Sequence, residues 1–161
     1  MDENDHTACV NAWMDLVDRG QPADALLSAF DRGFKALWRR TSQTLADVTL
    51  VAITERVLYA AAERYPFIGL LDVDETGLRS QALHKRVGQL KREELDEGIR
   101  FVLIEFLTIL GNLTAEILTP ALHSELSKTA QQENLSADDN KESGRTPQYR
   151  ASDGSAGGNA E

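Results

Sequence analysis

A cluster of oxygen-bearing side chains follows an apolar run near the middle of the chain, in the stretch FIGLLDVDETGL at residues 67–78. Asp72, Asp74 and Thr76 alternate along it, and Gly77 comes next. One carboxylate could attack an electrophile such as a phosphoryl group while its neighbour acts as an acid or base. The same oxygens could instead bind a hard cation. The elements that carry these residues decide between these possibilities.

The first interpretation is phosphoryl transfer. An apolar run followed by Asp72-x-Asp74-x-Thr76 resembles the first motif of the haloacid dehalogenase-like phosphatases. The resemblance implies Asp72 as the nucleophile and Asp74 as the acid/base, both at the end of a strand in a parallel sheet. It also implies later strands that supply further catalytic and metal-binding residues. The later sequence has helical periodicity instead, and its one adjacent Asp pair lies in a polar tail, so we do not expect this activity.

The second interpretation is a calcium-binding loop. Asp72, Asp74, Thr76 and Gly77 match positions one, three, five and six of the twelve-residue loop. The twelfth position needs a bidentate Glu, but this sequence has Leu83 there. Without that carboxylate we predict no metal site.

The third interpretation, which we favour, is a bend between two helices over Phe67–Gly77. Asp72, Asp74 and Glu75 would lie just before a helix start, where the helix dipole and free amides favour negative charge. Thr76 can cap that helix, because a hydroxyl accepts the free N–H groups of a first turn.

His84 is the most interesting single residue. It has Ser80 one turn before it and Gly88 one turn after it, so small residues flank the imidazole on its helix. The segment LHKRVGQL is similar to the phosphotransfer modules of bacterial phosphorelays. That resemblance implies His84 as the phospho-acceptor, with Gly88 giving access, although Val87 stands where the family usually has a Lys. A phosphorelay module is therefore the alternative function.

The remaining histidines suggest no metal site. His123, in ALHSELSK, resembles the phospho-accepting helix of sensor kinases, but no kinase domain follows it. Glu3 and His6 have a Glu-x-x-His spacing in the polar amino end, where we expect no second such motif to meet it. We predict no metal and no cofactor.

Four other side chains have expected structural roles. Glu105 interrupts the apolar run FVLIEFLTIL, and we expect an Arg from a neighbouring helix to pair with it, since an unpaired buried charge is costly. Arg56 is a candidate for this partner. Trp13 and Trp38 lie on apolar helical faces and are expected in the core.

Apolar periodicity predicts an all-α bundle of five or six helices over residues 1–128. The expected helices are Thr7–Asp18, Pro22–Arg40, a third that follows a Thr41-Ser42 cap and ends near Arg64, Leu78–Leu90, one from about Glu93, and a short one after Pro120. Few large apolar residues follow residue 128, so residues 129–161 are predicted to be a disordered acidic tail.

Charge and composition restrict the function further. Residues 1–128 hold 20 acidic against 14 basic side chains, and the whole chain has a net charge of −9, which opposes nucleic-acid binding. One cysteine, Cys9, suits a reducing cytoplasm, and no apolar run reaches the 20 or so residues that a bilayer needs. We predict a cytoplasmic, non-enzymatic regulatory or adaptor domain that binds a protein partner or a small apolar ligand. Signal transduction is one setting for it, and we expect a homodimer because two helices carry excess apolar surface.

Overall fold

The computed structural model describes the chain from residue 3 to residue 143, with side chains from residue 5 to residue 132. The α-helices are α1 (Glu3–Val17), α2 (Ala23–Thr41), α3 (Asp47–Arg64), α4 (Gln81–Arg86), α5 (Arg92–Leu113) and α6 (Thr119–Ser143). Two 3-10 turns, η1 (Pro66–Leu70) and η2 (Val87–Gln89), and two strands, β1 (Asp72–Asp74) and β2 (Gly77–Arg79), complete the described part. The predicted helical bundle is confirmed. No helix over residues 3–143 has both the length and the apolar character needed to cross a membrane.

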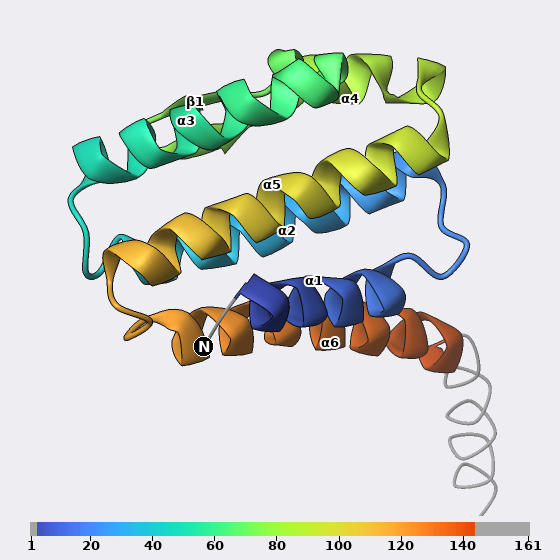
Figure 1. Cartoon of the computed structure of the whole chain (residues 1–161). Helices are drawn as coiled ribbons and strands as arrows, with labels where there is room; N and C mark the ends of the chain where they lie inside the picture. Colours follow the sequence, from blue (N-terminus) through green and yellow to red (C-terminus); the bar gives the residue numbers. More distant parts are fainter. Residues whose placement is uncertain (1–2, 144–161) are drawn as a thin grey trace, which may run out of the picture.

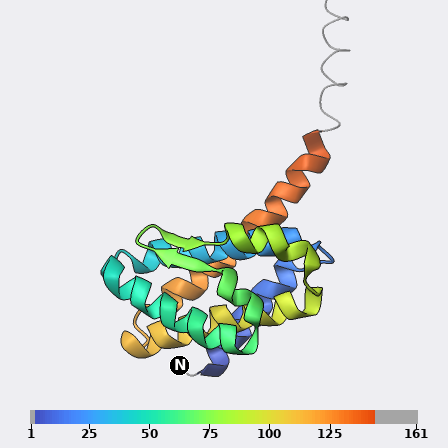
Figure 2. The ribbon, with the colours of Figure 1, turned by 90° about the horizontal axis from the view of Figure 1, so that it is seen from above.

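The helices pack in three layers (Figure 1). The middle layer consists of α2 and α5, one outer layer of α1 and α6, and the other of α3, the hairpin and α4. When the molecule is seen from above, the hairpin and α3 share this last layer (Figure 2). In it, β1 contacts α3 and β2 contacts α2, so the hairpin connects an outer helix to the middle layer.

The inner face of α2 carries the aromatic centre of the core. Leu27, Phe30, Phe34 and Leu37 lie along this face and are all buried. Phe34 packs against Phe106 of α5, with ring centroids 4.6 Å apart. Each such side chain stabilises the fold by about 2 kcal/mol when it leaves water, so this seam fixes α2 against α5.

The apolar surface of α5 is wide because helices contact it from both outer layers. Leu95, Ile99, Val102 and Phe106 form one buried row, and Leu103, Leu107 and Leu110 form a second buried row. Gly98 lies among them, and a Cβ there would come within 2.6 Å of the ring of Phe67. Glycine at this position therefore lets η1 pack closely on α5.

The predicted bend over Phe67–Gly77 is wrong in one respect, because part of it is a β-hairpin. Strands β1 and β2 pair antiparallel, with Val73 opposite Leu78. Thr76 lies in the hairpin turn and caps no helix; its N–H and hydroxyl both donate to Asp74. Gly77 follows with φ +126°, a conformation that side chains disfavour. The turn residues therefore reverse the chain here.

The helix predicted over Leu78–Leu90 is correspondingly shorter. Its first residues belong to β2, α4 begins at Gln81, and the chain tightens into η2 at Val87. Gly88 lies inside η2, and glycine favours helix poorly. His84 consequently lies on a helix of 6 residues.

The Thr41-Ser42 pair ends one helix and does not cap the next. Thr41 Oγ1 donates to the Leu37 carbonyl, and Ser42 Oγ donates to the Arg39 carbonyl. The Arg39 carbonyl is one of the last four of α2, which have no N–H partner within the helix, and the Ser42 hydroxyl satisfies it. The Thr41 hydroxyl bonds back to a carbonyl one turn earlier in the same helix. The next helix, α3, begins only at Asp47.

The expected end of the bundle at residue 128 falls inside α6. Thr129 and Ala130 are buried, and Thr129 Oγ1 accepts a hydrogen bond from Trp13 Nε1 at 3.0 Å. These small residues carry little apolar surface of their own, but they let α1 and α6 approach closely. The rest of the predicted tail, residues 144–161, lies outside the described residues.

Candidate functional site

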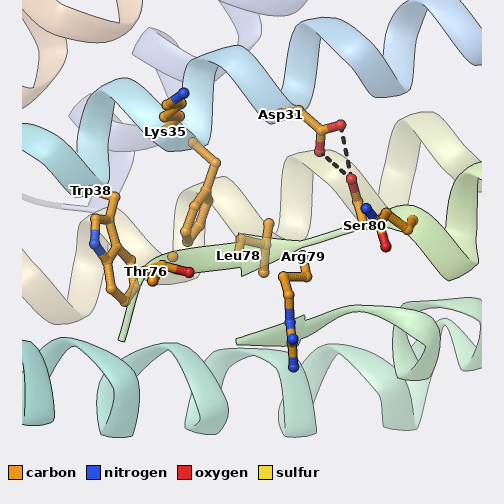
Figure 3. Close-up of a pocket in the computed structure, with 10 residues that line it drawn as sticks. Asp31, Lys35, Trp38, Thr76, Leu78, Arg79 and Ser80 are labelled. Carbon is orange, nitrogen blue, oxygen red and sulfur yellow. Dashed lines mark hydrogen bonds between the residues drawn. The ribbon is translucent and has the colours of Figure 1, made fainter. Parts of the chain in front are cut away.

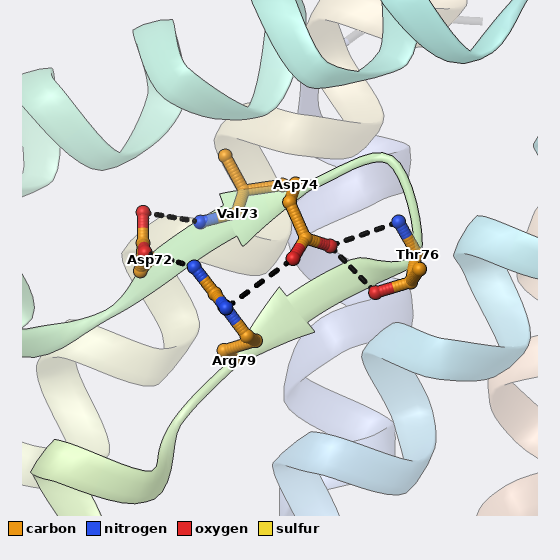
Figure 4. A network of polar contacts seen from close by, with 5 residues as sticks. All are labelled: Asp72, Val73, Asp74, Thr76 and Arg79. Atoms are coloured by element: carbon orange, nitrogen blue, oxygen red, sulfur yellow. Dashed lines mark hydrogen bonds and ion pairs between the residues drawn. The ribbon is translucent and has the colours of Figure 1, made fainter.

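The two hairpin carboxylates pair with a single arginine on the facing strand (Figure 4). Arg79 Nη2 lies 2.6 Å from Asp72 Oδ2, and its Nη1 lies 3.4 Å from Asp74 Oδ2. The hydrogen bonds from Thr76 lower the pKa of Asp74, and Arg79 adds to this shift. A guanidinium therefore already occupies the space between the carboxylates that a phosphoryl group or a calcium ion would need.

His84 binds two carboxylates of α2. Its Nε2 lies 2.7 Å from Asp31 Oδ2, and its Nδ1 lies 3.2 Å from Asp24 Oδ1. Ser80 Oγ also donates to Asp31, at 2.8 Å from both carboxylate oxygens. Burial lowers the pKa of His84, but the hydrogen bonds and charges of Asp31 and Asp24 outweigh burial, so the net shift is upward. The imidazolium form is therefore favoured.

A pocket of about 350 Å³ opens beside this cluster, between α2 and β2 (Figure 3). Trp38 and Thr76 lie at one end and the Asp31–Ser80 pair at the other, with Leu78 between them. Phe34 also lines the pocket. The size lies within the usual range for small-molecule sites, which are mostly apolar with a few polar groups.

Most of the charges around the pocket have partners within the protein. Asp31 binds Ser80 and His84, and Arg79 binds the two carboxylates of β1. Lys35 lines the pocket and has no ion pair with any described residue. The pocket therefore has an aromatic wall, the ammonium of Lys35, and the Asp31 and Ser80 side chains, which other residues hold in place.

The sequence predictions reached only part of this site. Trp38 was expected in the core, and it is 8% exposed, but its contribution to a pocket wall was not foreseen. Asp24 and Asp31 were not singled out, although their spacing of seven residues places them on one face of the helix. That spacing was the available signal for a polar cluster.

Other predicted residues behave differently. Glu105 is half-buried and Arg56 is exposed, and the two make no ion pair, so the expected pairing is wrong. His6 and His123, which sequence reasoning kept apart, lie 3.0 Å apart between Nδ1 and Nε2. Across the described residues, no three His, Cys, Asp or Glu side chains are placed to hold a metal ion.

Comparison of the chain with protein-family models, with curated proteins and with solved structures found no match. The class of protein is therefore defined by the three-layer helical bundle and by the chemistry of the pocket.

Proposed function

We propose that this protein is a non-enzymatic regulatory domain that binds a small molecule with an apolar body in the pocket between α2 and β2. The observation that carries this proposal is the pocket wall itself, where Phe34, Trp38 and Leu78 gather around about 350 Å³ of space. Aromatic and aliphatic walls bind ligands mainly through apolar contact, while a few polar groups fix orientation. The ligand's polar end would lie toward Lys35 or the Asp31–Ser80 pair.

The polar groups favour binding over catalysis. A nucleophilic hydroxyl needs a neighbouring base that can take its proton. Here Ser80 donates to Asp31, and both nitrogens of His84 lie against carboxylates. The Asp31 carboxylate that accepts from Ser80 is shared with His84, and no imidazole of a described residue is placed to take the Ser80 proton.

A ligand in this pocket would connect two structural layers. Its walls come from α2 in the middle layer and from β2 in the outer layer. A hairpin with strands of 3 residues has little stability of its own, so its position depends on packing. Binding would therefore hold the hairpin, and α3 beside it, more firmly against α2.

The outer helix α3 supports the second half of the proposal, a protein partner. Val48 and Tyr59 on α3 are 75% and 74% exposed, and their spacing of eleven residues places them on one face. A second copy of the chain is the partner we expect there. Light scattering at micromolar concentration should give twice the 17.8 kDa chain mass; a single-chain mass contradicts the homodimer but leaves the ligand site standing.

The phosphorelay alternative has weaker support. Phosphorylation of His84 would require a ring nitrogen to leave a carboxylate and would place a dianion beside Asp24 and Asp31. Incubation with a phosphorylated response regulator tests it. An acid-labile phosphoryl label that appears on the wild-type protein and not on the His84→Gln variant would restore this alternative.

The ligand site is tested with ring-matched probes: a naphthoate, a naphthol and a naphthylmethylamine. Titration calorimetry on the full chain should detect binding that Leu78→Gln weakens at least tenfold, because a polar group then enters the apolar wall. Leu90→Gln is the matched control, since Leu90 is also half-buried but lies outside the pocket. Equal affinities for the two variants, or no binding of any probe, would overturn the proposal.

A further inference from the structure

Two histidines from opposite ends of the chain meet between α1 and α6. His6 Nδ1 and His123 Nε2 are 3.0 Å apart, and the rings meet edge to face at 88°. His6 is 1% exposed, whereas His123 is half-buried. This contact joins the first turns of α1 and α6, next to the loop between α5 and α6.

The other nitrogen of His6 faces a carboxylate. Its Nε2 is buried without a hydrogen bond and lies 3.5 Å from Glu116 Oε1, the same oxygen that accepts from Thr119 Oγ1 at 2.6 Å. Because His6 turns opposite nitrogens to His123 and to Glu116, the three groups form a chain and do not converge on one point. A linear arrangement of this kind can share protons between its members, whereas a metal ion needs ligands that converge on one point.

Proton counting limits what the pair can hold. In the neutral pair one ring donates and the other accepts, which makes one hydrogen bond. A proton added to the other nitrogen of His123 leaves this bond in place. A second proton, on His6, would put an N–H on both facing nitrogens, so the bond would be lost and two cations would face each other. The closed pair therefore holds at most one added proton.

The surrounding charges do not remove this limit. Among the described residues, the charged groups that face the pair are Asp5 from α1 and Glu116 from the α5–α6 loop. They favour one positive charge, but they cannot separate the two facing N–H groups. Burial, followed by the charge of His6, lowers the pKa of His123 despite both carboxylates.

We propose that His6 and His123 form a pH-sensitive latch, which holds the first turn of α1 against α6 near neutral pH and opens on acidification.

Opening would also release the α5–α6 loop. Ala115 and Glu116 have φ of +52° and +64°, a left-handed backbone that is strained for residues other than glycine. The Glu116 side chain folds back over Gly111, where a Cβ would come within 2.6 Å of its carboxylate. Contacts to His6 and Thr119 hold Glu116 in this position, so loss of the His6 contact would free a strained turn.

The test is native-state hydrogen exchange on the full chain, which reports the opening equilibrium of α1 amides between pH 7.5 and pH 5. A free histidine titrates near pH 6.5, and one proton of difference changes an equilibrium up to tenfold per pH unit. We expect the opening constant to rise about tenfold between pH 6 and pH 5 in the wild type, and less than twofold in His123→Gln. His84→Gln is the control: it weakens the hairpin side, but the opening constant of the first turn of α1 should rise on acidification as it does in the wild type.

An equal rise in wild type and His123→Gln would overturn the latch. If His123→Gln does not fold, ring-carbon NMR of the wild type decides the question. Two histidines that protonate independently near pH 6.5, with unchanged protection of α1, would contradict it.

Discussion

The two outer layers of the molecule place histidines in opposite environments. On the hairpin side, His84 lies against Asp24 and Asp31 beside an open pocket. On the α1–α6 side, His6 and His123 lie against each other in a closed interface. Carboxylates stabilise the charged ring, whereas a second imidazole opposes it. The groups that contact each histidine therefore decide how that side of the molecule responds to protons, since the residue type is the same on both sides.

The direction of each response follows from the pKa shifts. The pKa of His84 is raised, so its contribution to stability is complete below the unfolded value near 6.5 and is lost as pH rises through the folded value. The pKa of His123 is lowered, so its contribution is complete above about 6.5 and is lost as pH falls toward the folded value. Acidification is therefore expected to loosen the α1–α6 side and to keep the hairpin side bound.

The largest expected effect comes from an α1–α6 contact that does not titrate. Trp13→Phe removes the hydrogen bond to Thr129 and leaves a cavity around a side chain that is 2% exposed. The free energy of unfolding should fall by about 2 kcal/mol in urea titrations. The loss should be the same at pH 6 and pH 8, because neither Trp13 nor Thr129 titrates there. A loss seen only at acidic pH would show that the Trp13–Thr129 contact depends on the histidine latch.

On the hairpin side, Asp31→Asn should have a smaller effect. Asp31 accepts from Ser80 and His84 but is 34% exposed, so we expect a loss of about 1 kcal/mol at pH 6. The loss should shrink toward pH 9 as His84 becomes neutral. An Asp24→Asn variant is the matched control, with a weaker effect because Asp24 is 71% exposed and its contact is longer.

His84→Gln sharpens the comparison between the two sides. Without the imidazolium, the variant should be less stable than the wild type below pH 6.5, and the gap should close as pH rises. Thermal melts at pH 5.5, 7 and 9 measure it. A gap that widens toward alkaline pH would show that the carboxylates do not hold His84 in its charged form.

The smallest effect is expected for Arg79→Gln. Arg79 and Asp72 are 57% and 65% exposed, and exposed ion pairs contribute little. The melting temperature should stay nearly unchanged. The variant leaves Asp72 and Asp74 unpaired, so calcium titration followed by NMR also checks the rejected metal interpretation, and we expect no saturable shift.

The helices could be predicted from sequence because their apolar periods are long, as in Leu95 to Phe106 of α5. The hairpin could not, since strands of 3 residues are too short to show alternation. The site was harder still. His84 and Asp31 are 53 residues apart in sequence, and His6 and His123 are 117 apart. Only the packing of the layers brings such pairs together, and no local sequence pattern indicates which residues will meet.

The measurement that tests the proposed function most directly is an NMR map of amide shifts in the full chain during titration with the naphthoate probe. We predict saturable shifts that centre on Phe34, Trp38 and Leu78, with no shift at Trp13 or Thr129 on the opposite side. Shifts that centre on the α1–α6 side, or that spread without saturation, would contradict the assignment of the α2–β2 pocket as the ligand site.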